Sequence, residues 1–124
     1  MNFKKYNRLL GFLSGLCAFV VYFLTVEPTA SYWDCAEYIS TSAKLQIGHP
    51  PGAPLFQMLG AVFSIIAFEN TQIAFTINLM SVTSSALTIV FMFWSVSLLS
   101  KKILKVKNEI SSEESFKIFG AAFL

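Results

Sequence analysis

Side chains that can carry charge or move a proton gather in one short segment of an otherwise apolar chain of 124 residues. They are two carboxylates, an ammonium and the chain's single imidazole: Asp34, Glu37, Lys44 and His49. A carboxylate can accept the proton of a hydroxyl group as that oxygen forms a new bond. An ammonium or imidazolium can neutralise a phosphate. Oxygen ligands can also hold a divalent cation, but two carboxylates do not demand one, and we assign no metal ligand.

Apolar residues dominate the rest of the chain, with 55% hydrophobic residues, 13% charged residues and 13 phenylalanines. A soluble domain of this length could not cover so much apolar surface, because small domains keep a large surface relative to their volume. The net charge of +2 is too small to indicate a nucleic acid partner. Cys17 and Cys35 lie at different expected depths, so we do not expect a disulfide. The composition predicts an all-α integral membrane protein.

The first spanning helix is predicted over residues 9–26, which are uncharged and long enough to cross a bilayer. A signal peptide shares the basic start and apolar core, but residues 25–28 make a poor cleavage site, so we expect the helix to be retained. The basic residues before it place the N-terminus, residues 1–8, in the cytoplasm. Gly11 and Gly15 form a GxxxG pattern, which is either a helix-packing face or a chance match.

The later apolar residues form two segments, 54–68 and 73–99, and a basic cluster follows the second. If only 73–99 spans, this cluster lies in the cytoplasm, as the positive-inside rule favours. Residues 54–68 then form a helix at the outer interface, although a short crossing stays open. We expect a cytoplasmic loop over 100–115 and the start of a third spanning helix over 116–124. The chain thus looks like part of a larger multi-pass protein, which we place in a bacterial inner membrane in preference to the endoplasmic reticulum membrane.

Residues 27–72 form the outer loop in this topology, and nothing between residues 34 and 47 breaks a helix. We therefore expect a juxtamembrane amphipathic helix over 34–47. Its apolar face would consist of Ala36, Ile39, Ala43 and Ile47. Its polar face would consist of Asp34, Glu37, Thr41 and Lys44.

These polar residues also have plainer interpretations. Asp34 and Glu37 have the spacing of a capping box, as do Ser31 and Asp34 one turn earlier. Lys44 can extend along the surface to reach a headgroup phosphate. His49 can be a hydrogen-bonding residue of the interface and no more. Spacing alone leaves these alternatives open.

A stiff corner comes after the predicted helix, with the sequence GHPPGAP over residues 48–54. Its prolines fix backbone φ, and Gly48 and Gly52 permit turns that other residues resist. Pro54 suits the first turn of the next helix. Such a corner would hold His49 in a set position, from which it could fold back towards the two acids.

The segment YWDCAEYISTSAKLQIGHPPGAPLFQMLG resembles the first outer loop of a family of multi-pass membrane proteins that includes a vertebrate protein O-mannosyltransferase. That family resembles the C-type (GT-C) glycosyltransferases, which include other protein O-mannosyltransferases and the oligosaccharyltransferase catalytic subunit. The match is strong over about residues 30–60, and the flanking helices match in layout only. Many relatives have glycine where this chain has Ala36, a small change on a helix. The larger departure is that this chain carries only the first of several outer loops.

The resemblance implies an enzyme that uses a polyprenyl or dolichyl phosphate sugar, with mannose expected. An aspartate of the first outer loop acts at the catalytic centre of such enzymes, and the matching position is Asp34. It would take the proton of a serine or threonine hydroxyl of an exported protein, with inversion at the sugar carbon. Glu37 would share this work, bind a metal or only cap, and His49, ahead of Lys44, would meet the donor phosphate.

A non-catalytic membrane scaffold or subunit is the alternative function. It would use the amphipathic helix to lie on membrane lipid and its spanning helices to pack on partners in a larger complex. A scaffold has no need for a His-Pro-Pro corner beside an acidic pair. A transporter fragment is disfavoured, because transporter polar groups usually lie at midplane and residues 73–99 carry no charge.

Overall fold

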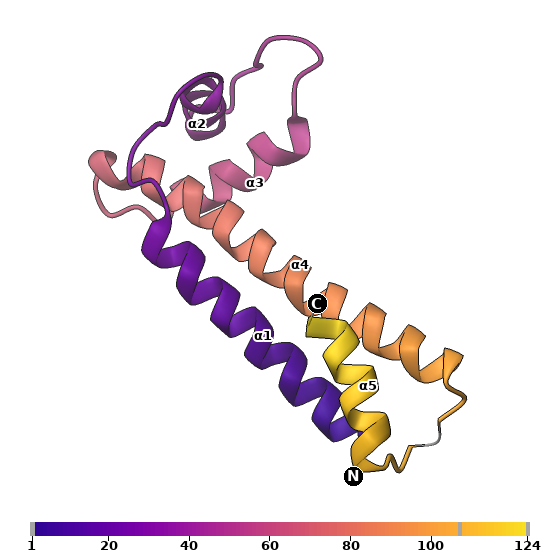
Figure 1. Ribbon diagram of the computed structural model, residues 1–124. Helices are drawn as coiled ribbons and strands as arrows, with labels where there is room; N and C mark the ends of the chain where they lie inside the picture. The colour runs from indigo at the N-terminus through magenta and orange to yellow at the C-terminus, as the bar shows by residue number, and fades with distance from the viewer. Residues whose placement is uncertain (1, 107, 124) are drawn as a thin grey trace. The chain divides into compact units, whose positions relative to one another are not determined.

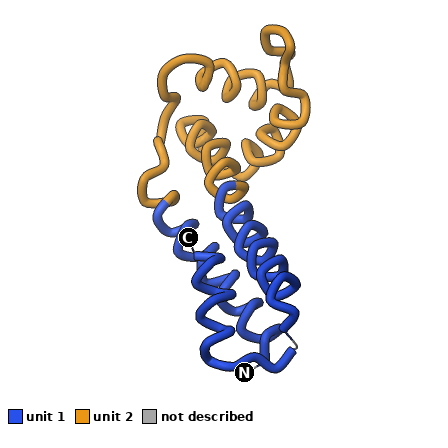
Figure 2. The backbone as a smooth tube through the Cα atoms, turned by 45° about the vertical axis from the view of Figure 1, so that its right-hand side comes forward, with its two compact units in different colours: residues 1–21, 85–124 blue, residues 22–84 orange. Residues whose placement is uncertain are grey.

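The computed structural model describes residues 2–106 and 108–123, and 74% of the chain is helical. No β-strand occurs among these residues, which confirms the predicted all-α membrane protein fragment. The chain divides into two compact units, Met1–Val21 with Ser85–Leu124 and Tyr22–Ser84 (Figure 2). We call them the terminal unit and the loop unit, and each is described by itself.

Two helices are long and apolar enough to cross a membrane, in agreement with the two predicted spans (Figure 1). Helix α1 covers Phe3–Thr25, so it begins before residue 9 and includes the basic residues. Helix α4 covers Ile73–Ile103 and follows a short 3₁₀ turn, η1 (Asn70–Gln72). It runs beyond residue 99 because nothing there breaks the helix, and its last turn carries two lysines that suit the carbonyl end of a helix dipole.

The GxxxG residues of α1 pack against α4 within the terminal unit. Gly11 and Gly15 are buried, and a Cβ atom at Gly11 would overlap the indole of Trp94. A Cβ atom at Gly15 would overlap the side chain of Val90. The pattern is therefore a helix-packing face, where the small residue lets two backbones approach.

Helix α5 (Ser112–Phe123) completes the terminal unit, and it begins four residues before the predicted third spanning segment, 116–124. The connection from α4 is accordingly shorter than the predicted loop over 100–115. The rings of Phe3 and Phe119 stack with centroids 5.8 Å apart. The core around them consists of Phe3, Phe93, Ile110, Ile118 and Phe119.

In the loop unit, helix α2 (Cys35–Ala43) packs on helix α3 (Pro54–Ser64). Ser42 is fully buried and lies against Gly60, where a Cβ atom would come within 2.8 Å of the serine side chain. The rings of Tyr38 and Phe56 meet edge to face at 5.3 Å. Glycine at position 60 thus lets the two short helices approach closely.

The predicted helix over residues 34–47 is wrong in its last part. Helix α2 ends at Ala43, and Leu45 adopts a left-handed φ of 49°. The Gln46 N–H donates to the Thr41 carbonyl at 2.8 Å, a bond that closes the helix end. Glycine usually occupies the left-handed position after a helix, so nothing in the sequence signals this ending.

The predicted faces of this helix are wrong as well. Ala36 is exposed and Ile47 is 96% exposed, while Ile39 is buried. Thr41, which we placed on the polar face, is buried, because α3 covers it and supplies a hydrogen-bond partner.

Helix α3 begins at Pro54 as expected, but it ends at Ser64 and not at residue 68. Single-turn hydrogen bonds continue from Ile65 to Ala67, so this end of the segment unwinds gradually. At 11 residues, α3 is shorter than the two candidate spans.

Candidate functional site

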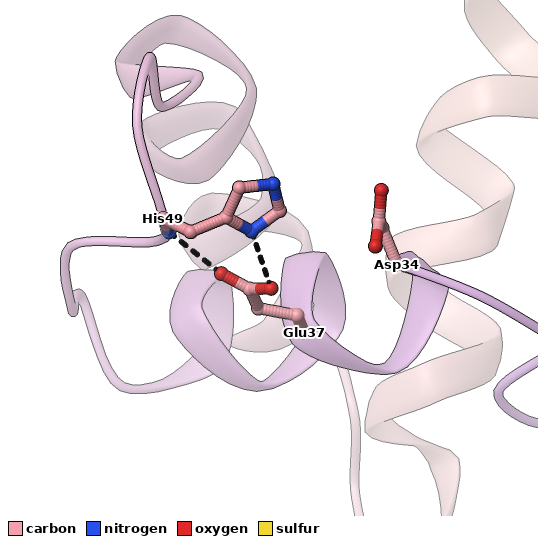
Figure 3. A group of neighbouring side chains, drawn as sticks. All are labelled: Asp34, Glu37 and His49. Atoms are coloured by element: carbon pink, nitrogen blue, oxygen red, sulfur yellow. Dashed lines mark hydrogen bonds and ion pairs between the residues drawn. The ribbon is translucent and has the colours of Figure 1, made fainter.

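The proline-rich corner folds back onto α2 and brings His49 to Glu37 (Figure 3). The backbone N–H of His49 donates to Glu37 Oε1 at 2.7 Å, and its ring Nδ1 lies 2.7 Å from Glu37 Oε2. The corner itself turns between His49 and Gly52, whose N–H donates to the His49 carbonyl at 2.9 Å. Gly52 has a φ of 73°, which explains why glycine stands there. The Pro50–Pro51 peptide bond is cis.

Asp34 completes the cluster from the start of α2. One ligand atom each of Asp34, Glu37 and His49 lies within 4.8 Å of the others. Figure 3 shows the Asp34 carboxylate beside the imidazole, while both drawn hydrogen bonds join His49 to Glu37. The Asp34 side chain caps no backbone N–H and has no side-chain hydrogen bond within the described part of the chain. Its carboxylate is therefore available to a ligand.

The capping-box interpretation of Asp34 and Glu37 is not what the structure shows. Asp34 occupies the N-cap position with helical dihedrals, φ −72° and ψ −6°, and its side chain makes no cap bond. Both carboxylate oxygens of Glu37 are hydrogen-bonded to nitrogen atoms of His49. The tertiary contact across 12 residues has replaced the local one.

Hydrogen bonding sets the protonation of the pair. The bond from the His49 backbone N–H, and then that from its ring, lower the pKa of the Glu37 carboxyl below its ordinary value. The bond to Glu37 and then the charge of that carboxylate raise the pKa of the His49 imidazole, with a smaller contribution from the charge of Asp34. Both shifts favour the charged forms of the pair, a carboxylate and an imidazolium.

Three neighbours that we gave no catalytic role support this pair. The Thr41 hydroxyl donates to the backbone carbonyl of Glu37 at 2.7 Å and accepts from Gln57 Nε2 at 3.2 Å. A Cβ atom at Gly48 would lie 3.1 Å from both Gln57 Nε2 and Glu37 Oε1. Glycine in front of His49 is the one sign in the sequence that a side chain approaches the corner closely.

Lys44 does not join the cluster. It occupies the C-cap of α2, is exposed, and forms no ion pair with a carboxylate of the described residues. A continuous helix over 34–47 would have placed Lys44 on the face of Asp34 and Glu37, but the helix ends just before it. Its part in donor binding stays a prediction.

The cluster offers three chemical capabilities. Asp34 can accept a proton, because its oxygens are uncommitted and partly open to solvent. With Nδ1–H directed at Glu37, Nε2 of the His49 ring faces away from that carboxylate, and in the protonated ring it can donate to a ligand. The three side chains are also close enough to hold a metal ion, although Glu37 would have to share oxygens already bonded to His49.

Comparison with known proteins identifies the family. The family profile described as the N-terminal domain of protein O-mannosyl-transferase TMEM260 matches residues 34–124, most of the chain and all of the site. The chain belongs to this family. Our predicted resemblance to protein O-mannosyltransferases is thereby confirmed.

Two curated relatives carry the same name. Protein O-mannosyl-transferase tmem260 of Dictyostelium discoideum is 35% identical over 80 residues, and its counterpart in Mus musculus is 31% identical over 80 residues. Each alignment covers 64% of this chain but only 10% and 11% of the respective relative. The chain thus spans about a tenth of the length of these TMEM260 proteins. No solved structure matches it.

Proposed function

We propose that this chain supplies the first outer loop of a membrane enzyme that transfers mannose to hydroxyl groups of exported proteins. The names of its TMEM260 relatives support mannosyl transfer to protein. The observation that carries the proposal is the uncommitted carboxylate of Asp34, which lies within 4.8 Å of a fixed carboxylate–imidazole pair. The donor is a polyprenyl or dolichyl phosphate mannose, and the acceptor is a serine or threonine.

Asp34 acts as the general base. The acceptor O–H donates to an Asp34 oxygen, and the hydroxyl oxygen attacks the anomeric carbon as its proton moves to the carboxylate. The bond from that carbon to the donor phosphate breaks at the same time, and the lipid phosphate leaves with the electron pair. It needs no strong acid, because it is stable as an anion. A single displacement of this kind inverts the configuration of the sugar carbon.

Glu37 positions the histidine and does not take the proton. Both of its oxygens bind His49, so it holds the imidazolium with Nε2 free to meet the donor phosphate. Even with His49 protonated, two carboxylates and one imidazolium leave a net charge of −1 on the cluster. More positive charge must therefore come from outside it to hold the phosphate, either from Lys44 or from later outer loops.

The site lies outside the cytoplasm in this proposal, with residues 1–8 on the cytoplasmic side and the remaining spanning helices of a GT-C fold following.

Replacement of Asp34 by asparagine in the full-length protein tests the proposal. Asparagine suits the N-cap position, so the fold should be kept, while mannosyl transfer falls by at least about 100-fold. Glu69→Gln is the matched control, because it removes an exposed carboxylate of the same unit and should leave transfer unchanged. Transfer by Asp34→Asn at the rate of the control would refute the role of Asp34.

A further inference from the structure

The terminal unit carries a groove that the proposed transfer reaction does not use. It measures about 350 Å³ and lies between the basic end of α1 and the last turns of α4. Its walls are Phe3, Lys4, Asn7, Arg8, Phe12, Trp94 and Leu98. The groove is thus lined by two cations and by aromatic and aliphatic side chains.

The order of these side chains along the helices gives the groove a polar mouth and an apolar interior. Lys4, Arg8 and Phe12 lie at steps of four residues, so they form one stripe on α1. Leu98 and Trp94 form the facing stripe of α4 at the same step. The groove passes from cations at the helix end to apolar rings about 12 Å further along the helix.

The cations at the mouth are not neutralised by the protein itself. Neither Lys4 nor Arg8 forms an ion pair in the part of the chain that the structure describes. Lys101, by contrast, lies 4.5 Å from the centre of the Phe3 ring and donates to Asn108 Oδ1 at 2.7 Å. A lysine and an arginine one turn apart can meet the same phosphate, and a guanidinium can bind it through two hydrogen bonds.

Hydrogen bonds and ring contacts fix the inner wall. The Trp94 Nε1–H donates to the Asn7 carbonyl at 3.1 Å, so the indole N–H has its hydrogen-bond partner within the protein. The Phe12 ring meets Trp94 edge to face at 5.3 Å. Asn7 and Ser97 are buried and hydrogen-bonded to each other, which holds the two helices in register. Phe12, Trp94 and Leu98 of this wall offer a chain of methylene groups a mainly apolar surface.

We propose that this groove binds one anionic phospholipid from the leaflet that the basic end of α1 meets. The phosphate lies between Lys4 and Arg8, and an acyl chain lies on Phe12, Trp94 and Leu98. A free phosphate would use only the mouth, whereas a phospholipid uses the whole groove. Basic pockets between spanning helices bind anionic headgroups by this combination of charge and apolar surface.

Site-specific photo-crosslinking in the full-length protein tests the proposal. Benzoylphenylalanine is placed at Leu98, which lines the groove, or at Leu99, which does not, although both leucines are similarly exposed at 53% and 58%. The probe lipids are equal amounts of phosphatidylglycerol and phosphatidylcholine in vesicles. The ratio of captured phosphatidylglycerol to phosphatidylcholine should be at least about fivefold higher at Leu98, the factor expected from one basic residue near an anionic lipid.

Charge variants show whether the mouth causes this preference. Lys4→Gln with Arg8→Gln should reduce the ratio at Leu98 to that at Leu99, and Lys4→Arg with Arg8→Lys should retain it. Lys102→Gln with Lys105→Gln removes the same charge from the last turn of α4 and the residues just after it, outside the groove, and should leave the ratio high.

Three outcomes would overturn the proposal. The first is an equal ratio at Leu98 and Leu99, and the second is an equal loss in the control pair, which would mean diffuse attraction. The third is capture of protein and not lipid at Leu98, which would mean that another segment fills the groove.

Discussion

Helices α2 and α5 both begin with a side chain that can cap a helix, with a glutamate three residues later. At α5 the Glu114 N–H donates to Ser111 Oγ at 3.2 Å, and the Ser111 N–H donates to Glu114 Oε2 at 2.8 Å. This is a complete capping box. At α2 Asp34 makes no cap bond, and Glu37 binds His49. Equal spacing in the sequence therefore leads to a local structural motif in one helix and a tertiary polar site in the other.

The two helix starts differ because a competing partner reaches only one of them. The chain after α2 turns back at residues 48–54 and delivers a backbone N–H and an imidazole to Glu37. Glu37 thereby has two partners at the corner in place of the single bond that a cap would provide. Nothing in the described chain competes for Glu114, so it keeps its local partner. A stiff corner near an acidic pair is thus the feature that turns a capping pattern into a candidate site.

In the comparison of the two helix starts, the largest expected effect comes from the same substitution at both glutamates. Glu37→Gln removes the charge that holds the imidazolium, and mannosyl transfer by the full-length protein should fall roughly 10- to 100-fold, as when a carboxylate that orients a histidine is lost. Glu114→Gln should leave transfer unchanged, because glutamine also completes a capping box. Equal transfer by the two variants would mean that Glu37 has no role beyond structure.

The same Gly→Ala substitution at two positions should distinguish a tightly packed glycine from one with open space around it. Gly15→Ala places a methyl group against Val90 and should lower the free energy of unfolding by about 1–3 kcal/mol, the usual cost of overpacking. Gly120→Ala meets no atom within 4 Å and should be neutral or slightly stabilising, because alanine favours a helix. Thermal unfolding in detergent measures both. Similar midpoints for the two variants would contradict the tight contact of α1 with α4.

The smallest expected effect concerns the caps themselves. Ser111→Ala removes a bonded cap and should cost about 1 kcal/mol of stability. Asp34→Ala removes a side chain that bonds no backbone group, so its cost should be clearly smaller. Unfolding curves of the two variants provide the comparison. A larger loss for Asp34→Ala would show that Asp34 caps α2 in solution.

Much of the fold is predictable from the sequence, because long apolar runs leave few alternatives. The runs over 9–26 and 73–99 predict α1 and α4, whose helices extend further because the basic residues beside them are also good helix formers. The early end of α2 is not predictable in this way. Leu45 takes a left-handed conformation that leucine rarely adopts, and the bond from the Gln46 N–H to the Thr41 carbonyl closes the helix around it.

The site is predictable only in part, because the sequence indicates the residue types but not where helix α2 ends. The types of Asp34, Glu37 and His49 and the stiffness of the corner single out these residues, but only the structure brings the three together. The helical spacing that also included Lys44 failed, because it assumes a helix that continues. The support from Gln57 could not be foreseen, since it depends on how α3 packs against α2.

The titration of His49 tests the central claim, that Glu37 holds His49 as an imidazolium, most directly. His49 is the only histidine of this chain, so its ¹⁵N resonances can be followed with pH in detergent without overlap from another imidazole. The pKa of His49 is raised by Glu37, so the support that the pair gives to the corner is complete at pH values below the unfolded pKa and is lost as pH rises through the folded pKa. We predict a midpoint above the ordinary value in the wild-type chain and a lower midpoint in Glu37→Gln. The same midpoint in both chains would contradict the claim.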